Sequence, residues 1–365
     1  MHVMINALQA GNRSGTGRYT TELVHALASL PDAPELTAIW PDTAPCPEVP
    51  NIRFIQRPAR ANQRILFDQW GMLELRERLG ADVVHYPANF SPATMLRNLV
   101  LTVHDLSFLH YPGWFRVDRA LYYRHAIRRS VRQAKHIIAD SLATKQDLCD
   151  FLDVPECGVT VIPLGVSPDY APVGPDVREQ IRGKYGLPRS FFLFVGTLEP
   201  RKNLPRLVAA FDAVAGKVPQ DLVIVGRPGW KTGAIDEAIA AARHRDRIHL
   251  PGFVASEDLP ALLGNAHAFV WPSLLEGFGL PPLEAMACGV PVLSSNTSSI
   301  PEVCGEAALL VNPLHVDDIA DGLRRLSQEE GLCQRLSEAG RARAARFTWR
   351  RTATATLSVY QSALY

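Results

Sequence analysis

The chain has 365 residues, of which 47% are hydrophobic and 21% are charged, so it is long enough for two domains of ordinary size. Its formal net charge of +1 gives no general attraction to nucleic acid, and we expect no nucleic-acid partner. The six cysteines show no CxxC spacing, and we expect neither disulfides nor a metal site.

The first residues, "MHVMINALQAG", run directly into a short apolar strand and a glycine turn. They lack the basic region and the long apolar core that a signal peptide would have. No apolar stretch approaches the roughly 20 residues that a membrane-spanning helix requires. We therefore expect the protein to be cytoplasmic.

Short apolar segments alternate with helical sequence in residues 1–165, which predicts an amino-terminal Rossmann-like domain with a doubly wound parallel sheet. The strand candidates are "HVMINAL", "LTAIW", "IRFI", "DVVHYP", "LVLTVHD", "HIIAD" and "VTVIPLG". Gly15 and Gly17 stand between the first strand and the first helix, where helix N–H groups can face an anion. Their spacing falls short of GxGxxG, so both phosphate binding and a simple turn remain open.

Residues 163–176 carry proline and glycine too densely for a helix or strand, which predicts a linker. A second α/β series follows and predicts a carboxy-terminal domain over residues 166–348. Its strand candidates are "FFLFVG", "DLVIVG", "RIHLPGF", "AFVWPS", "VPVLSS" and "AALLVN". Residues 349–365 have helical sequence, and we expect this helix to cross back to the first domain. The fold class is therefore α/β, with two Rossmann-like domains expected to face a central cleft.

The segment "PSLLEGFGLPPLEAMACGVPV" places Glu276 and Glu284 eight positions apart. A predicted strand precedes it, and Pro281 and Pro282 mark the start of a predicted helix. We expect Glu284 in the first helical turn. Glu276 should lie in the loop at the carboxyl end of the strand, where open α/β sheets bind ligands. Taken singly, each acid can also be explained as a charge facing the helix dipole or the solvent.

Three basic side chains also lie where strands are predicted to end. Arg201 and Lys202 precede a helix in "VGTLEPRKNL", where two cations can act together on a phosphate pair, although most such residues are solvated. His104 ends a strand of the first domain in "LTVHDLSF". A lone histidine is more often structural than catalytic, and Asp105 beside it can cap the following turn.

Together these segments resemble a known family. "VGTLEPRKNL", "VIVGRPGWKT", "LPGFVASEDL", the segment with both glutamates and "ALLVNP" are similar to the nucleotide-sugar domain of retaining glycosyltransferases of the GT-B fold, family GT4. "SGTGRY", "TVHDLSF", "IIADS" and "VIPLGV" extend a looser similarity to the amino-terminal half. The spacing of Glu276 and Glu284 matches the family's E-x7-E hallmark. The sequence as a whole resembles the bacterial mannosyltransferase-like branch of this family, which builds cell-surface polysaccharides.

The resemblance implies a role for each matched residue. Glu284 would accept hydrogen bonds from the ribose hydroxyls, while Glu276 and His104 would approach the donor sugar. Lys202, with Arg201 beside it, would neutralise the diphosphate. The family's further arginine at this site is replaced by Thr197. The remaining donor contacts would come, mostly through the backbone, from Val254, Phe278, Gly279 and Leu280.

The resemblance implies a retaining, metal-independent hexosyltransferase without a cofactor, with His104, Glu276 and Lys202 as catalytic residues. The sequence contains no D-x-D triplet for a divalent metal, and fixed cations would replace one. GDP-mannose is the favoured donor and a UDP-sugar the next, with a glycan or lipid-linked acceptor. A non-hydrolysing sugar-nucleotide epimerase and a non-catalytic nucleotide-sugar-binding protein are the alternatives, because fold alone does not decide function.

Between Trp114 and His136 the chain carries seven arginines and lysines against one acid, Asp118. The segment has helical character. It can be a solvated helix face whose arginine stems cover apolar surface. It can also dock peripherally on the anionic inner face of a membrane.

Overall fold

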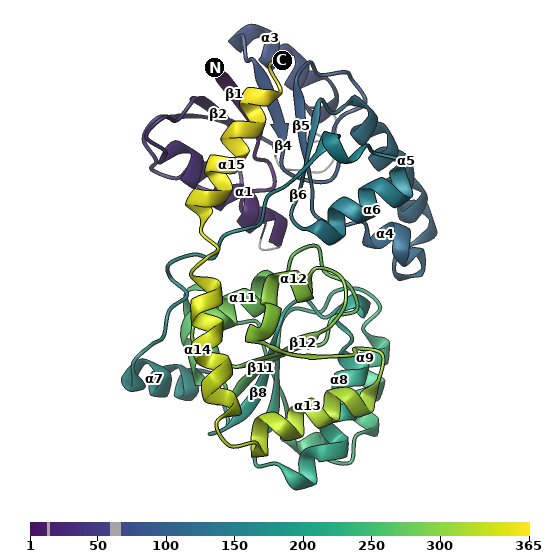
Figure 1. Ribbon diagram of the computed structural model, residues 1–365, viewed down its shortest axis with the longest axis vertical. Coiled ribbons are helices and arrows are strands. Elements are labelled where there is room, and N and C mark those ends of the chain that lie inside the picture. The colour runs from purple at the N-terminus through teal and green to yellow at the C-terminus, as the bar shows by residue number, and fades with distance from the viewer. Residues whose placement is uncertain (13–14, 59–66) are drawn as a thin grey trace. The chain divides into compact units, whose positions relative to one another are not determined.

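The computed structural model describes residues 1–12, 15–58 and 67–365, and its contacts divide the chain into two compact units (Figure 1). Unit 1 comprises Met1–Gly165 and Phe347–Tyr365, and unit 2 comprises Val166–Arg346. Each unit has one parallel sheet whose strands alternate with helices along the chain. The predicted α/β fold class with two Rossmann-like domains is confirmed.

The sheet of unit 1 has the strand order β3-β2-β1-β4-β5-β6-β7. Its central strands are apolar because helices cover both faces; every residue of β5 is buried. The strand order reverses between β1 and β4. At such a switch point, ligands can bind at the carboxyl ends of the strands. The strands are β1 (His2–Asn6), β2 (Glu35–Pro41), β3 (Ile52–Arg57), β4 (Val83–Tyr86), β5 (Leu99–Val103), β6 (His136–Ala139) and β7 (Val159–Val161).

The helices of unit 1 include the last helix of the chain. Helix α15 lies beside α1 (Figure 1). Its Tyr360 is fully buried. The longer helices are α1 (Gly15–Ala28), α3 (Met72–Leu79), α5 (Val117–Gln133), α6 (Leu142–Leu152) and α15 (Trp349–Ser362). The short turns are η1 (Phe67–Gly71), α4 (Ser107–His110), η2 (Pro112–Trp114) and η3 (Glu156–Gly158).

The sheet of unit 2 has the strand order β10-β9-β8-β11-β12-β13, and this order reverses between β8 and β11. Its strands are β8 (Phe191–Val195), β9 (Asp221–Val225), β10 (Ile248–Gly252), β11 (Ala268–Trp271), β12 (Val292–Ser295) and β13 (Leu309–Val311). Its α-helices are α7 (Pro175–Tyr185), α8 (Leu204–Val214), α9 (Gly233–Ala241), α10 (Leu259–Asn265), α11 (Leu280–Ala287), α12 (Ile300–Cys304), α13 (Val316–Gln328) and α14 (Leu332–Ala344). Short 3-10 turns are η4 (Pro200–Lys202), η5 (Ala215–Lys217), η6 (Arg245–Arg247), η7 (Ser256–Asp258) and η8 (Gly305–Ala307).

Two predicted boundaries are wrong in detail. The linker was predicted to reach residue 176, but α7 begins at Pro175, because proline is well suited to the first helical position. Helix α11 begins at Leu280, so Glu284 is its fifth residue and lies beyond the first turn. The helix can begin this early because Gly279 adopts the left-handed conformation before it, with φ 112°.

Among the residues that the structure describes, no helix combines the length and the apolar character that crossing a membrane demands.

Candidate active site

Loops from several strands are tied together at the carboxyl edge of the unit 2 sheet. Asn203, which follows η4, donates through Nδ2 to the carbonyl oxygens of Pro272 (3.0 Å) and Pro313 (2.6 Å). It is buried and left-handed, with φ 61°, a conformation that asparagine adopts more readily than most residues. The loops after β8, β11 and β13 therefore share one buried amide, which the sequence analysis did not identify.

The loop between β11 and α11 is fixed by two serines that precede α12. The hydroxyl of Ser298 donates to the carbonyl oxygen of Glu276 (2.6 Å). That of Ser299 lies within reach of the carbonyl oxygens of Glu276 (2.9 Å) and Phe278 (2.8 Å). Gly279 has φ 112°, a backbone conformation that residues with a side chain rarely adopt, so this position favours glycine.

Glu276 lies between two cations. Its Oε1 accepts hydrogen bonds from Lys202 Nζ (2.7 Å) and the Ser273 hydroxyl (2.5 Å), and its Oε2 accepts one from Arg201 Nη1 (2.8 Å). Arg201 also donates through Nε to Glu199. These residues, Glu199, Arg201, Lys202 and Glu276, form what we call the charge network.

The charge network is largely shielded from solvent. The side chains of Lys202 and Glu276 are each 7% exposed, that of Glu199 is 5% exposed and that of Arg201 is 24% exposed. Lys202 Nζ also lies 4.3 Å from the ring centroid of Trp271, the last residue of β11. Two carboxylates face two cations, so the formal charges cancel. Arg201 and Lys202 are therefore not the solvated loop charges that the sequence left open.

The network determines the ionisation of Glu276. Burial, the largest single influence, would raise the pKa of this carboxyl group, but the charges of Arg201 and Lys202 lower it. Hydrogen bonds from Lys202 and Ser273 act in the same direction, and together they lower the pKa from 4.5 to about 2. Glu276 is therefore ionised at neutral pH.

The other predicted donor contacts of unit 2 are mostly buried side chains. Glu284 is 6% exposed on α11, at the same edge of the sheet. Val254, Phe278 and Leu280 are at most 7% exposed. Pro281 and the proline after it carry no N–H, which leaves the start of α11 fewer donors for an anion than an ordinary helix has.

In unit 1, His104 is held on both sides of its ring. Nδ1 lies 2.6 Å from Oδ2 of Asp140, and Nε2 lies 3.0 Å from the carbonyl oxygen of Pro87. Burial alone would lower the pKa of His104, but the charge and hydrogen bond of Asp140 and the Pro87 carbonyl raise it above its ordinary value. Asp105 accepts a hydrogen bond from the N–H of Ser107 (3.0 Å), so it caps the following turn as predicted.

Gly15 and Gly17, in the first turn of α1, differ in their surroundings. A Cβ at Gly17 would lie 1.9 Å from the carbonyl oxygen of Asn12, so close packing of the preceding loop already explains this glycine. A Cβ at Gly15 would meet open space. Residues 13–14, between that loop and the helix, lie outside the described residues, so phosphate binding here stays a prediction.

The structure thus brings together Arg201, Lys202 and Glu276 in unit 2, and places Glu284 at the same edge. It adds Glu199 and Ser273, which the sequence analysis missed, and Asp140 in unit 1. The partner of His104 could have been found from the sequence, because "LTVHD" and "HIIAD" are neighbouring predicted strands and each is followed by a polar residue. Parallel strands bring such residues to one edge.

The chain matches known proteins over nearly its whole length. Residues 177–343 match the family described as "Glycosyl transferases group 1", and residues 13–170 match "Glycosyltransferase Family 4". The chain is 30% identical to the O-antigen chain mannosyltransferase B of Escherichia coli over 366 residues, covering 95% of this chain and 96% of that protein.

Solved structures resemble the fold at lower sequence identity. A sucrose-phosphate synthase from Thermosynechococcus elongatus superposes with a TM-score of 0.78 at 20% identity, covering 99% of this chain and 98% of that chain. Anabaena Alr3699/HepE in complex with UDP-glucose superposes with a TM-score of 0.76 at 17% identity, covering 99% of each chain.

Proposed function

Because the chain belongs to the group 1, family 4 glycosyltransferases and has the GT-B fold, we propose that it moves a hexose from a nucleotide diphosphate sugar to a glycan or lipid-linked acceptor. GDP-mannose is the favoured donor, since the E. coli relative is named as a mannosyltransferase. A UDP-sugar is the next candidate, since a structural neighbour holds UDP-glucose. The product would belong to a cell-surface polysaccharide, as the relative's O-antigen name suggests.

The observation that carries this proposal is the buried carboxylate of Glu276 between two cations at the carboxyl edge of a sheet. A sugar nucleotide presents an anionic diphosphate directly beside a hydroxylated sugar. Lys202 and Arg201 suit the diphosphate, and Glu276 suits the sugar hydroxyls. Glu284 would accept hydrogen bonds from the ribose, with backbone contacts from the loops that contain Val254 and Gly279.

Transfer breaks the bond between the anomeric carbon and the phosphate oxygen, and negative charge develops on the leaving diphosphate. Lys202 and Arg201 would stabilise that charge without a metal ion. The acceptor oxygen would bond to the anomeric carbon from the same face, and its proton would pass to the leaving phosphate oxygen. This route retains the anomeric configuration and requires no protein nucleophile.

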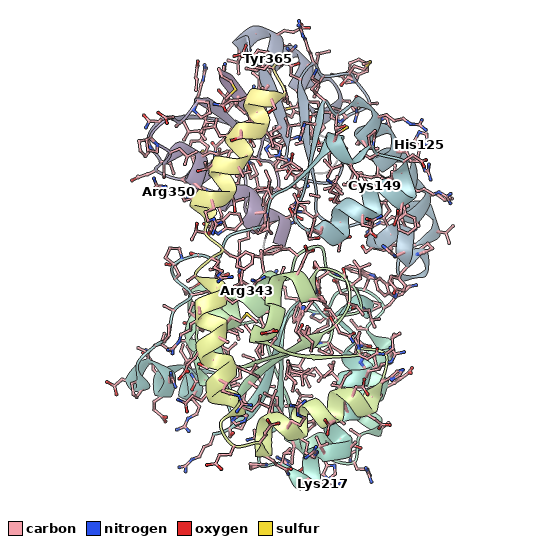
Figure 2. The ribbon with its side chains drawn as sticks, viewed as in Figure 1. His125, Cys149, Lys217, Arg343, Arg350 and Tyr365 are labelled. Carbon is pink, nitrogen blue, oxygen red and sulfur yellow. The ribbon has the colours of Figure 1, made fainter. Side chains whose placement is uncertain are left out.

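The test is incubation of the purified protein with GDP-mannose and UDP-glucose, in the presence and absence of EDTA. Release of nucleoside diphosphate with one donor, unaffected by EDTA, is expected. Lys202→Ala should abolish it, whereas Lys217→Ala should not, because Lys217 precedes β9 at the opposite edge of the same sheet (Figure 2). An epimerised sugar nucleotide would instead indicate the epimerase, and binding without turnover the non-catalytic protein.

Helix α5 supports a location at a membrane surface. Among its basic residues, Arg128 and Arg129 donate to the carbonyl oxygens of Phe151 (3.4 Å) and Ser91 (3.3 Å), so they also serve packing within unit 1. Three others, Arg119, Arg124 and Arg132, are exposed. Beside them are exposed apolar side chains, Val117 (77%), Leu121 (63%) and Tyr122 (60%). Figure 2 shows His125, on the same helix, at the surface of unit 1.

A helix that carries exposed arginines together with exposed apolar side chains suits an anionic bilayer. We therefore propose that the protein lies in the cytoplasm, peripheral to the inner membrane face. Replacing the three exposed arginines with glutamine should weaken sedimentation with anionic vesicles by about 10²-fold, since each contributes about 1 kcal/mol. The matched control replaces Lys217, Arg245 and Arg350, which are also exposed. Equal loss in both variants, or no binding at low salt, would argue against α5 as the docking surface.

A further inference from the structure

His104 and Asp140 meet because of strand register. Strands β5 and β6 are parallel neighbours, and Val103 is paired with Ala139. His104 and Asp140 are the residues that follow this pair, so the two side chains leave the sheet side by side at its carboxyl edge. Their Nδ1–Oδ2 distance of 2.6 Å is therefore built into the fold.

The two contacts of the His104 ring determine its protonation. A carbonyl oxygen and an ionised carboxylate can only accept hydrogen bonds. The contacts to Pro87 (3.0 Å) and Asp140 therefore both form only when both ring nitrogens carry a proton. In a neutral imidazole, one nitrogen lone pair would face an acceptor oxygen at hydrogen-bond distance.

The surroundings of the ring also favour its positive charge. Asp140 is 2% exposed, and its Oδ1 is buried without a hydrogen-bond partner among the described residues. A buried carboxylate is costly unless a cation compensates it, and His104 is placed to do so. Asp105 adds a second negative charge nearby. On β4, burial and the charge of His104 lower the pKa of His85 to about 3, so His85 is neutral.

One further group packs against the ring. Tyr19 of α1 meets it edge to face, with 4.9 Å between ring centroids. Burial and the charge of Asp140 raise the pKa of Tyr19, so its hydroxyl stays protonated and uncharged. The charged groups identified around His104 are thus two carboxylates.

We propose that Asp140 is a positioning residue that holds His104 as a doubly protonated imidazolium, so that His104 is a fixed cation and cannot act as a base. Its part in the reaction rests on the proposed function. The ring cannot take the proton of the acceptor hydroxyl, because both nitrogens already hold one. Under the proposed function, that proton passes to the leaving phosphate oxygen.

The charge state can be measured without substrate. In protein labelled with ¹⁵N-histidine, both ring nitrogens of His104 should show the chemical shifts of N–H groups at neutral pH, with the signals assigned by their loss in His104→Gln. In Asp140→Asn the ring should become neutral at the same pH. The matched control is Asp105→Asn, which removes a nearby charge but no contact with the ring and should leave the imidazolium intact.

The wild-type spectrum decides the charge state even if Asp140→Asn does not fold. A neutral His104 ring in the wild type, including one that shares its proton with a neutral Asp140, would overturn the proposal. So would an imidazolium that survives unchanged in a folded Asp140→Asn variant.

The pH dependence of donor turnover shows whether His104 acts as a cation or as a base. The contacts of both ring nitrogens favour the imidazolium, and because the pKa of His104 is raised, this charge is lost only as the pH rises through that pKa. Wild-type turnover should therefore fall only on the alkaline side, and Asp140→Asn turnover should fall at lower pH. At neutral pH the variant should turn over the donor more slowly than the wild type.

If His104 were a base, turnover would rise as the ring loses its proton, and that result would refute the proposal. If the wild type turned over no donor, the proposed function would fail while the NMR result would stand.

Discussion

Replacing Glu276 with glutamine should destabilise unit 2 at neutral pH. The carboxylate accepts hydrogen bonds from Lys202 (2.7 Å), Arg201 (2.8 Å) and Ser273 (2.5 Å), and its pKa is lowered from 4.5 to about 2. That difference corresponds to about 3 kcal/mol in favour of the folded, ionised state. It agrees with the roughly 3–5 kcal/mol that breaking a buried ion pair costs.

The loss should depend on pH with a definite sign. Because the folded-state pKa of Glu276 lies below its unfolded value, the stabilisation is complete above 4.5 and disappears as the pH falls toward about 2. The difference between the wild type and Glu276→Gln should therefore be largest at neutral pH and nearly absent near pH 2. Hydrogen exchange of β8 and β11 reports the opening of unit 2 separately from unit 1.

Two controls sharpen this measurement. Glu237→Gln removes an exposed glutamate from α9 of the same unit and should change stability little. Lys202→Met combined with Glu276→Gln should cost less than the sum of the single changes, since each single variant leaves a buried charge without its partner. Additive losses, or a Glu276→Gln variant as stable as the wild type at neutral pH, would refute the reasoning.

Three further outcomes follow from the site and the core. Glu284→Ala should weaken donor binding, which titration calorimetry can measure. Glu276→Ala should mainly lower turnover, which initial rates can measure. Each effect should be about 1–3 kcal/mol. Gly279→Ala should destabilise unit 2 by at least about 1 kcal/mol in urea unfolding, because alanine disfavours φ 112°. Unit 1 should lose stability as the pH falls from 6.5 toward 3, because unfolding frees His85 to bind a proton. His85→Gln should flatten that slope in hydrogen exchange of β4.

The fold could be predicted from the sequence because the strands of a parallel sheet that is covered on both faces are short, apolar segments. Each predicted apolar run became a strand, since a buried parallel strand tolerates few polar residues. Helix starts were less accurate, and the start of α11 shows why. Proline is acceptable at several positions of a first turn, so Pro281 and Pro282 left the first residue of the helix uncertain.

The sequence predicted which residues belong to the candidate site, but not which of them contact one another. Arg201, Lys202 and Glu276 were identified individually, yet Lys202 and Glu276 are 74 positions apart in the chain. Their ion pair depends on the loops that Asn203 and Ser299 hold in place, and no local pattern encodes such hydrogen bonds. Glu199 was missed for the same reason, because a buried counterion of Arg201 looks like any loop glutamate in sequence.

The cancelled charges of the network bear on how a donor could bind. Under the proposed function, a diphosphate must replace Glu276 as the partner of Arg201 and Lys202, so binding is an exchange of anions rather than the filling of a positive site. Glu276 then loses its cationic partners and requires new hydrogen-bond donors, which the hydroxyls of the donor sugar can supply. A nucleoside diphosphate that has lost the donor sugar does not supply these hydroxyls, so the carboxylate that helps to bind the donor also disfavours retention of the spent nucleotide.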